Sequence, residues 1–123
     1  MRDSKQVQEL KVVQDTYDFT LWLLGQIEKF PRQHRYSLGI DMEKRLQRVL
    51  ELLLRAKYSR RKTDYLNDAN IEMEILRFQL RLAKDLRALS VKSHGQATGM
   101  ALAIGAQIGG WLAHRPAGEG KTP

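Results

Sequence analysis

Apolar residues recur along most of this chain at steps of three and four residues. Between residues 4 and 29 they are Leu10, Val13, Tyr17, Leu21, Leu24 and Ile27. Between residues 33 and 58 they are Leu46, Val49, Leu50, Leu53 and Leu54. This spacing places each set on one face of an amphipathic helix. The pattern therefore predicts two helices, separated at Pro31, a residue suited to the first turn of a helix.

Residues 76–82 read LRFQLRL and alternate apolar with polar side chains, which by itself is typical of a half-exposed strand. The surrounding sequence favours a helix instead, because no Gly or Pro lies between residues 64 and 90 and helix-forming residues are frequent. We therefore predict a third helix over 64–90 and a fourth over 94–114. The remaining segment, 115–123, has a composition typical of a disordered tail.

Four helices with short connections predict an all-α fold, a single antiparallel up-down-up-down four-helix bundle over residues 1–114. A chain of 123 residues is long enough to bury one core. The chain has no cysteine, which excludes disulfides, thiolate zinc sites and cysteine nucleophiles. Its charged N-terminus lacks an apolar signal segment, so we expect a cytoplasmic protein.

The predicted third helix is apolar on two adjoining sides. One side carries Ile71, Ile75, Phe78, Leu82, Leu86 and Leu89. The other carries Met73, Leu76, Leu80 and Ala83. A surface helix of a bundle normally buries a narrower stripe. We therefore expect apolar partners on both flanks, supplied by the same bundle or by another subunit.

The predicted fourth helix also has two kinds of face. Small residues repeat every four positions at Ala97, Ala101, Gly105, Gly109 and Ala113, and a bulky face carries Met100, Ile104, Ile108, Trp111 and Leu112. Gly in a helix costs about 1 kcal/mol relative to Ala. We therefore expect another helix, from the same or another chain, to pack closely on this segment. The contacts would involve Ala101, Gly105, Gly109 and Trp111. The segment is too weakly hydrophobic to favour a membrane span.

The excess positive charge lies in the helical middle of the chain. Residues 31–92 hold fifteen Lys and Arg against eight Asp and Glu. Polyanions are the natural partners of such a surface. The candidate contacts are Arg77, Arg81, Lys84 and Arg87 on the third helix, Lys44, Arg48 and Arg55 on the second, and Arg60, Arg61 and Lys62 between them.

A second interpretation of these cations is an ordinary solvated surface. Glu74 with Arg77, and Arg81 with Asp85, have the spacing of ion pairs within one helix. Glu51 is likewise placed to neutralise its neighbours on the second helix. Catalytic chemistry is not indicated, because the three histidines lie far apart and no phosphate-binding glycine loop is present. We expect no enzymatic activity, no metal and no cofactor.

Three segments resemble one family. YDFTLWLLGQIEKFPRQHRYSLG at 17–39, LRFQLRLAKDLR at 76–87 and GGWLAH at 109–114 are similar to the accessory variability determinant (Avd) proteins of diversity-generating retroelements. The wider group includes four-helix-bundle proteins encoded in intervening sequences of 23S ribosomal RNA genes. The resemblance covers roughly residues 7–114.

The resemblance implies a basic, non-catalytic protein that assembles as a homopentameric barrel of four-helix bundles. It further implies association with the retroelement reverse transcriptase and support for error-prone copying of template RNA into cDNA, with RNA or DNA bound. The family's arginines map onto Arg77 and Arg81, which we expect to face a polyanion or the polymerase. The alternative is a structural or interaction bundle like the intervening-sequence proteins, without a polymerase partner.

Overall fold

The computed structural model describes residues 4–114, with side chains from residue 7 onward. This part of the chain forms α1 (Ser4–Ile27), α2 (Arg32–His34), the π-helical turn η1 (Arg35–Gly39), α3 (Ile40–Tyr58), α4 (Lys62–Asp85) and α5 (Val91–Ala113). It contains no strand, so the all-α prediction and the helical interpretation of LRFQLRL, which lies within α4, are confirmed. The predicted disordered tail, 115–123, lies outside the described residues.

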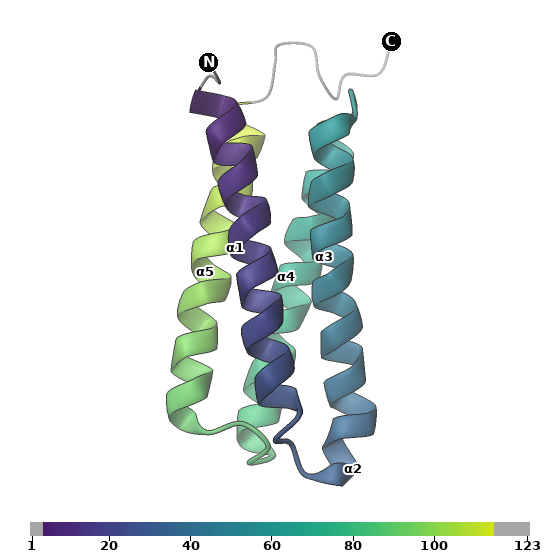
Figure 1. Ribbon diagram of the computed structural model, residues 1–123, viewed down its shortest axis with the longest axis vertical. Coiled ribbons are helices and arrows are strands. Elements are labelled where there is room, and N and C mark those ends of the chain that lie inside the picture. Colours follow the sequence, from purple (N-terminus) through teal and green to yellow (C-terminus); the bar gives the residue numbers. More distant parts are fainter. Residues whose placement is uncertain (1–3, 115–123) are drawn as a thin grey trace.

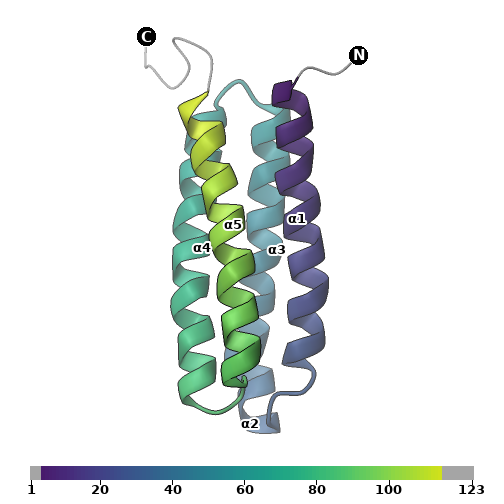
Figure 2. The ribbon, with the colours of Figure 1, turned by 90° about the vertical axis from the view of Figure 1, so that its left-hand side faces the viewer.

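The four long helices stand side by side as a bundle (Figure 1). Around the bundle, α1 packs against α3 and α5, and α4 packs against the same two helices. Figure 2 shows α5 flanked by α4 on one side and by α1 on the other. Successive long helices run in opposite directions, so α1 begins and α5 ends at the same end of the bundle, which we call the terminal end (Figure 1).

Each long helix contributes one stripe of apolar side chains to a single core. Among its fully buried members are Phe19 and Leu23 of α1, Leu46 and Leu53 of α3, Leu76 and Leu80 of α4, and Ile104 and Ile108 of α5. Burying a side chain of this size contributes about 1.5–3 kcal/mol relative to leaving it in water. These buried side chains therefore provide most of the stabilisation that holds the bundle together. The predicted apolar face of the first helix is corrected here, because Tyr17 and Leu21 are about half exposed and of that set only Ile27 is fully in the core.

The connection between α1 and α3 depends on one glycine. Pro31 precedes α2, and the chain then continues through η1 directly into α3. Gly39 ends η1 and is buried; a Cβ atom there would lie 2.8 Å from Cγ2 of Ile27. Only glycine permits this approach of the turn to the end of α1.

In the connection between α4 and α5, the predicted end of the third helix and the predicted start of the fourth are both wrong. The third helix does not extend to residue 90 but ends at Asp85, because Arg87 adopts a left-handed conformation with φ of 62°. The backbone N–H groups of Ala88 and Leu89 then donate to the carbonyl oxygen of Ala83, at 2.8 and 3.1 Å. The fourth helix begins at Val91 rather than 94, because Ser90 Oγ accepts a hydrogen bond from the backbone N–H of Ser93.

The bundle covers only one of the two apolar flanks of α4. Met73, Leu76, Leu80 and Ala83 are buried in the core. The other flank, which we call the α4 apolar face, stays 38% to 62% exposed and consists of Ile71, Ile75, Phe78, Leu82 and Leu86. Of the residues predicted on that flank only Leu89 is buried. No helix in the described part of the chain is long and apolar enough to cross a membrane.

Candidate functional site

A surface groove runs between α4 and α5 and contains the predicted arginines. One hollow of about 210 Å³ is lined by Glu74, Arg77, Phe78 and Arg81 of α4 with His94 and Thr98 of α5. An adjoining hollow of about 340 Å³ shares Glu74 and Arg77 with the first and reaches Asn70, Gly105 and Ala106. We call the two together the α4–α5 groove.

The cations of this groove are paired with acidic residues of their own helix. Nη1 of Arg77 lies 3.0 Å from Oε2 of Glu74, Nε of Arg81 lies 4.0 Å from Asp85, and Nζ of Lys84 lies 3.6 Å from the same carboxylate. Exposed pairs of this kind contribute about 0.3–0.5 kcal/mol each. Lys84 and Asp85 are not among the residues that line the groove. The weak pairs leave the guanidinium groups of Arg77 and Arg81 able to exchange partners for a phosphate.

Two groove residues were not foreseen from the sequence. His94 and Thr98 are both half-buried and come from α5, one helical turn apart. Both residues lie in the predicted fourth helix four positions apart, but nothing in the sequence indicated that this side of the helix faces α4. Arg87 stands at the end of α4, exposed, with no ion pair among the residues that the structure describes.

The predicted cations of α3 do not join this groove, because α3 packs between α1 and α4. Arg48 lies 4.0 Å from Glu51 and 3.9 Å from Glu72. Arg55 lies 3.1 Å from Glu51, whose hydrogen bond raises the pKa of the Arg55 guanidinium. Lys44 is exposed and forms no ion pair within residues 7–114. These three side chains form a separate, largely neutralised surface.

The basic cluster between α3 and α4 divides into two kinds of residue. Arg60 and Arg61 are exposed, without an ion pair in the described part of the chain. Lys62 belongs to the first turn of α4 and donates to the backbone carbonyls of Ala56 and Lys57, at 2.8 and 3.0 Å. Its ammonium group caps the end of α3, so its first role is structural.

The small residues of α5 divide between the core and the surface. Ala101 and Trp111 are buried in the bundle of the same chain. Gly105 lines the α4–α5 groove and Gly109 faces outward, and a Cβ atom at either position would meet no heavy atom within 4 Å. Four residues turn a helix by roughly 40° more than one full turn, so a stripe that starts in the core rotates to the surface. The expected close helix approach at these glycines is wrong within one chain, and only a contact between chains remains a prediction.

A polar cluster joins α3 to α4, and the sequence did not reveal it. The Arg45 guanidinium donates to Glu72, Gln79 and Asp41, each at 3.0 Å. Hydrogen bonds from Gln79 first, and from Arg45 second, lower the pKa of Asp41. Within residues 7–114 no three His, Asp or Glu side chains are grouped so that they could hold a metal ion.

A family model described as bAvd-like matches residues 10–115 of this chain. The match therefore covers most of α1, the whole of α3, α4 and α5, and both halves of the α4–α5 groove. No curated protein and no solved structure matches the chain.

Proposed function

This chain belongs to the bAvd-like family, and we propose that it binds nucleic acid and the reverse transcriptase of a diversity-generating retroelement. Family membership supports an accessory role in such a retroelement, in a family whose members are non-catalytic. The protein would then assist mutagenic copying of template RNA into cDNA. The polymerase itself would carry out the chemistry.

The α4–α5 groove is the observation that supports a polyanion ligand. Arg77 and Arg81 stand one turn apart on its wall, opposite the hydrogen-bonding side chains of His94 and Thr98. Arginine binds phosphate through two parallel N–H donors, and hydroxyl and imidazole groups supply further contacts to phosphate and sugar. The groove is open along its length, as an extended strand requires.

We also propose that the functional unit is a homo-oligomer, with five chains as the number implied by the family. The α4 apolar face supports this proposal, since monomers rarely expose contiguous apolar surface of this extent. The outer face of α5 borders the groove and exposes Gly109 together with Leu102 and Ala106, which also line the groove, without any charge. A neighbouring chain would cover both surfaces.

Binding to RNA across a salt series tests the groove. Fluorescence anisotropy of a labelled single strand should show affinity that falls steeply with salt. Arg77→Ala/Arg81→Ala should weaken binding of unrelated sequences about equally and flatten the salt slope by roughly one to two units. The matched control is Arg48→Ala/Arg55→Ala, which also removes two exposed arginines paired with an acidic residue of their own helix. Equal losses in both variants would assign binding to diffuse charge and reject the groove.

A second candidate function is a structural or interaction bundle without a polymerase partner. The ion pairs of Arg77, Arg81 and Lys84 favour this second function, because pairs between neighbouring residues of one helix are also typical of an ordinary solvated surface. Co-purification with the reverse transcriptase encoded beside the gene distinguishes the two functions. A reverse-transcriptase gene flanked by template and variable repeats, with a stable complex, supports the first; their absence supports the second.

A further inference from the structure

The connection between α3 and α4 presents an exposed aromatic residue among cations. Residues 57–62 read KYSRRK and hold four cations and no acidic residue. Figure 2 shows this connection at the terminal end of the bundle, and none of its residues lines the α4–α5 groove. The segment therefore forms a second positive surface on the same chain, separate from the groove.

Tyr58 is the unusual residue of this surface. It is 80% exposed, more than any other aromatic residue that the structure describes, whereas the nearby Tyr65 packs against the core. Nζ of Lys57 lies 5.2 Å from the centroid of the Tyr58 ring, a cation–π contact that occupies one face of the ring at most. At this exposure the other face is open to a flat ligand.

An apolar strip on the outer side of α3 leads up to the Tyr58 ring. Leu50 and Leu54 precede Tyr58 by eight and four residues, so the three side chains share one side of the helix. The three line an open hollow of about 570 Å³, together with Gln47, Glu51 and Arg55. The Glu51 carboxylate is neutralised, because Nη2 of Arg55 lies 3.1 Å from it. The hollow therefore extends the ring with a flat, weakly charged surface.

Two arginines follow the ring along the chain. Arg60 and Arg61 are exposed, and neither forms an ion pair with Asp64 or with another described residue. Arg77 and Arg81 of the groove, by contrast, each have a carboxylate within 4.0 Å. A phosphate that binds Arg60 and Arg61 displaces no acidic partner, and a guanidinium can donate two parallel N–H groups to it.

Hydrogen bonds hold the connection in one conformation. Nζ of Lys62 donates to the backbone carbonyls of Ala56 and Lys57, at 2.8 and 3.0 Å. The backbone N–H of Arg61 donates to Oγ of Ser59 at 2.9 Å. The segment that carries the ring and the two arginines is therefore tied to the end of α3.

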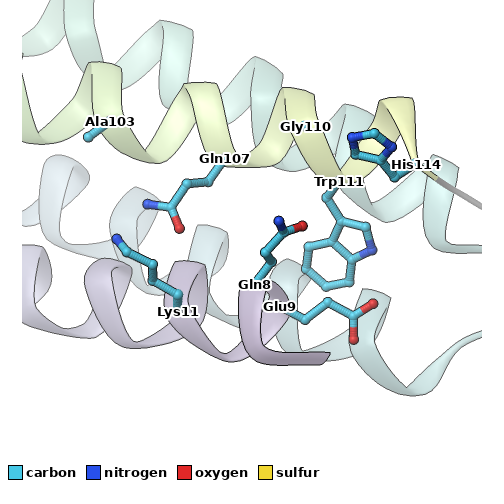
Figure 3. Close-up of a pocket in the computed structure, with 8 residues that line it drawn as sticks. All are labelled: Gln8, Glu9, Lys11, Ala103, Gln107, Gly110, Trp111 and His114. Carbon is cyan, nitrogen blue, oxygen red and sulfur yellow. The ribbon is translucent and has the colours of Figure 1, made fainter. Parts of the chain in front are cut away.

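Trp111 ties the same lysine to α5. Nζ of Lys62 lies 6.0 Å from the centroid of the Trp111 ring. Trp111 is 6% exposed and lines a pocket of about 430 Å³ between α1 and α5, together with Glu9 (Figure 3). The connection is thus anchored on a buried residue of another helix before a ligand arrives. A surface fixed in advance loses less conformational entropy on binding.

We infer that Tyr58 stacks on an unpaired base of a single-stranded nucleic acid whose phosphates bind Arg60 and Arg61. The inference rests on the proposed nucleic-acid function and adds a second site to it. An aromatic ring beside cations is the arrangement that binds single strands, since every base has a flat face and every nucleotide a phosphate. Bases within a duplex are stacked on each other and cannot cover the ring.

Fluorescence anisotropy with two labelled strands separates stacking from charge. One probe is an oligouridine, and the other has the same length and phosphates but abasic sugars. Tyr58→Ala should weaken the oligouridine by about tenfold and leave the abasic strand within about twofold. The salt slope should stay the same, because no charge is removed. Tyr58→Phe keeps the ring and should bind both strands as the wild type does.

Two further variants serve as controls. Tyr17→Ala removes another exposed tyrosine, which lies on α1 next to Asp18, and should keep the wild-type affinity. Arg60→Ala/Arg61→Ala should weaken both strands alike and flatten the salt slope by roughly one to two units. Thermal melts verify that every variant folds.

Each contrary outcome has a distinct meaning. Wild-type protein that binds neither strand would reject the proposed nucleic-acid function and the stacking site together. If the wild type binds and Arg77→Ala/Arg81→Ala weakens it while Tyr58→Ala does not, the groove remains and the stacking site is rejected. Equal losses of both strands in Tyr58→Ala, or an equal loss in Tyr17→Ala, also overturn the inference. Unchanged RNA affinity with lost co-purification of the reverse transcriptase would assign Tyr58 to a protein partner instead.

Discussion

The guanidinium of Arg45 holds the carboxylate of Glu72 across the α3–α4 interface, with Nη1 and Oε1 3.0 Å apart. The two side chains are only 20% and 17% exposed. The same guanidinium also donates to Gln79 and Asp41, so three of its N–H groups are used. An ion pair that is mostly removed from water and supported by further hydrogen bonds fixes how two helices are placed relative to each other.

Removing one member of this pair should destabilise the bundle. Glu72→Ala leaves the half-buried guanidinium of Arg45 without its main partner, and the expected loss is about 1–3 kcal/mol in the free energy of unfolding. Urea denaturation followed by circular dichroism measures it. The control, Glu74→Ala, removes the exposed partner of Arg77 and should cost less than about 0.5 kcal/mol. Similar losses in both variants would show that the α3–α4 pair has no special role.

Acid should weaken the fold through two aspartates. Hydrogen bonds from Lys11 and Gln107 lower the pKa of Asp15, and those from Gln79 and Arg45 lower the pKa of Asp41. A carboxyl whose pKa is lower in the folded state stabilises that state at pH values above the ordinary aspartate pKa of about 3.9. This stabilisation is lost as pH falls through the folded pKa.

The melting temperature should therefore fall between about pH 5 and pH 2, by a small amount because both groups are largely solvated. Asp41→Asn should reduce the pH dependence. Asp68→Asn, which changes an exposed carboxylate without an ion pair in the described chain, should leave it unchanged. Parallel pH profiles for all three proteins would contradict the assignment.

Gly39 should not tolerate a side chain. Gly39→Ala places a Cβ 2.8 Å from Cγ2 of Ile27, so the connection or the end of α1 must shift. The expected cost is about 1–3 kcal/mol, measured as the free energy of unfolding. Gly99→Ala is the comparison, because its Cβ meets open space in a helix and should stabilise the fold by about 0.5–1 kcal/mol. A neutral Gly39→Ala would show that the turn relaxes freely.

The α4 apolar face should control assembly. Light scattering of the purified protein should give a mass near five chains. Phe78→Glu/Leu82→Glu should reduce that mass to one chain while the helical content is retained, since both side chains are exposed in the single bundle. Tyr58→Glu, at an exposed aromatic residue of α3, is the control and should keep the assembly. A wild-type protein that is monomeric at micromolar concentration would reject the proposed oligomer.

A substitution at Gly109 tests the stability of the single bundle and the assembly of chains independently. Because its Cβ position is open in one chain, Gly109→Leu should leave the thermal stability of the single bundle intact. If another chain packs on α5, the same change should lower the oligomer mass. Unchanged mass and melting temperature together would show that the outer face of α5 is simply exposed.

The spacing of Arg77 and Arg81 could be identified from the sequence, because positions four apart on a helix always share a side. The residues that surround the two arginines could not be identified from the sequence. His94 and Thr98 reach the groove only because α5 packs beside α4. Glu9 is likewise unremarkable in the sequence, and only the fold places it in one pocket with Trp111, about a hundred residues away along the chain.

For the fold, the apolar periodicity, the absence of Gly and Pro between residues 64 and 90, and Pro31 determined four helices, because these effects act within a few residues of the chain. The tertiary structure alone decided which flank of α4 is buried. Both flanks are apolar, but a helix in a four-membered bundle presents one side to the core, and Leu76 and Leu80 occupy it while Phe78 and Leu82 do not. The same geometry rotates Gly109 outward and brings Arg45 to Glu72, because helix crossing positions are set by packing rather than by local sequence.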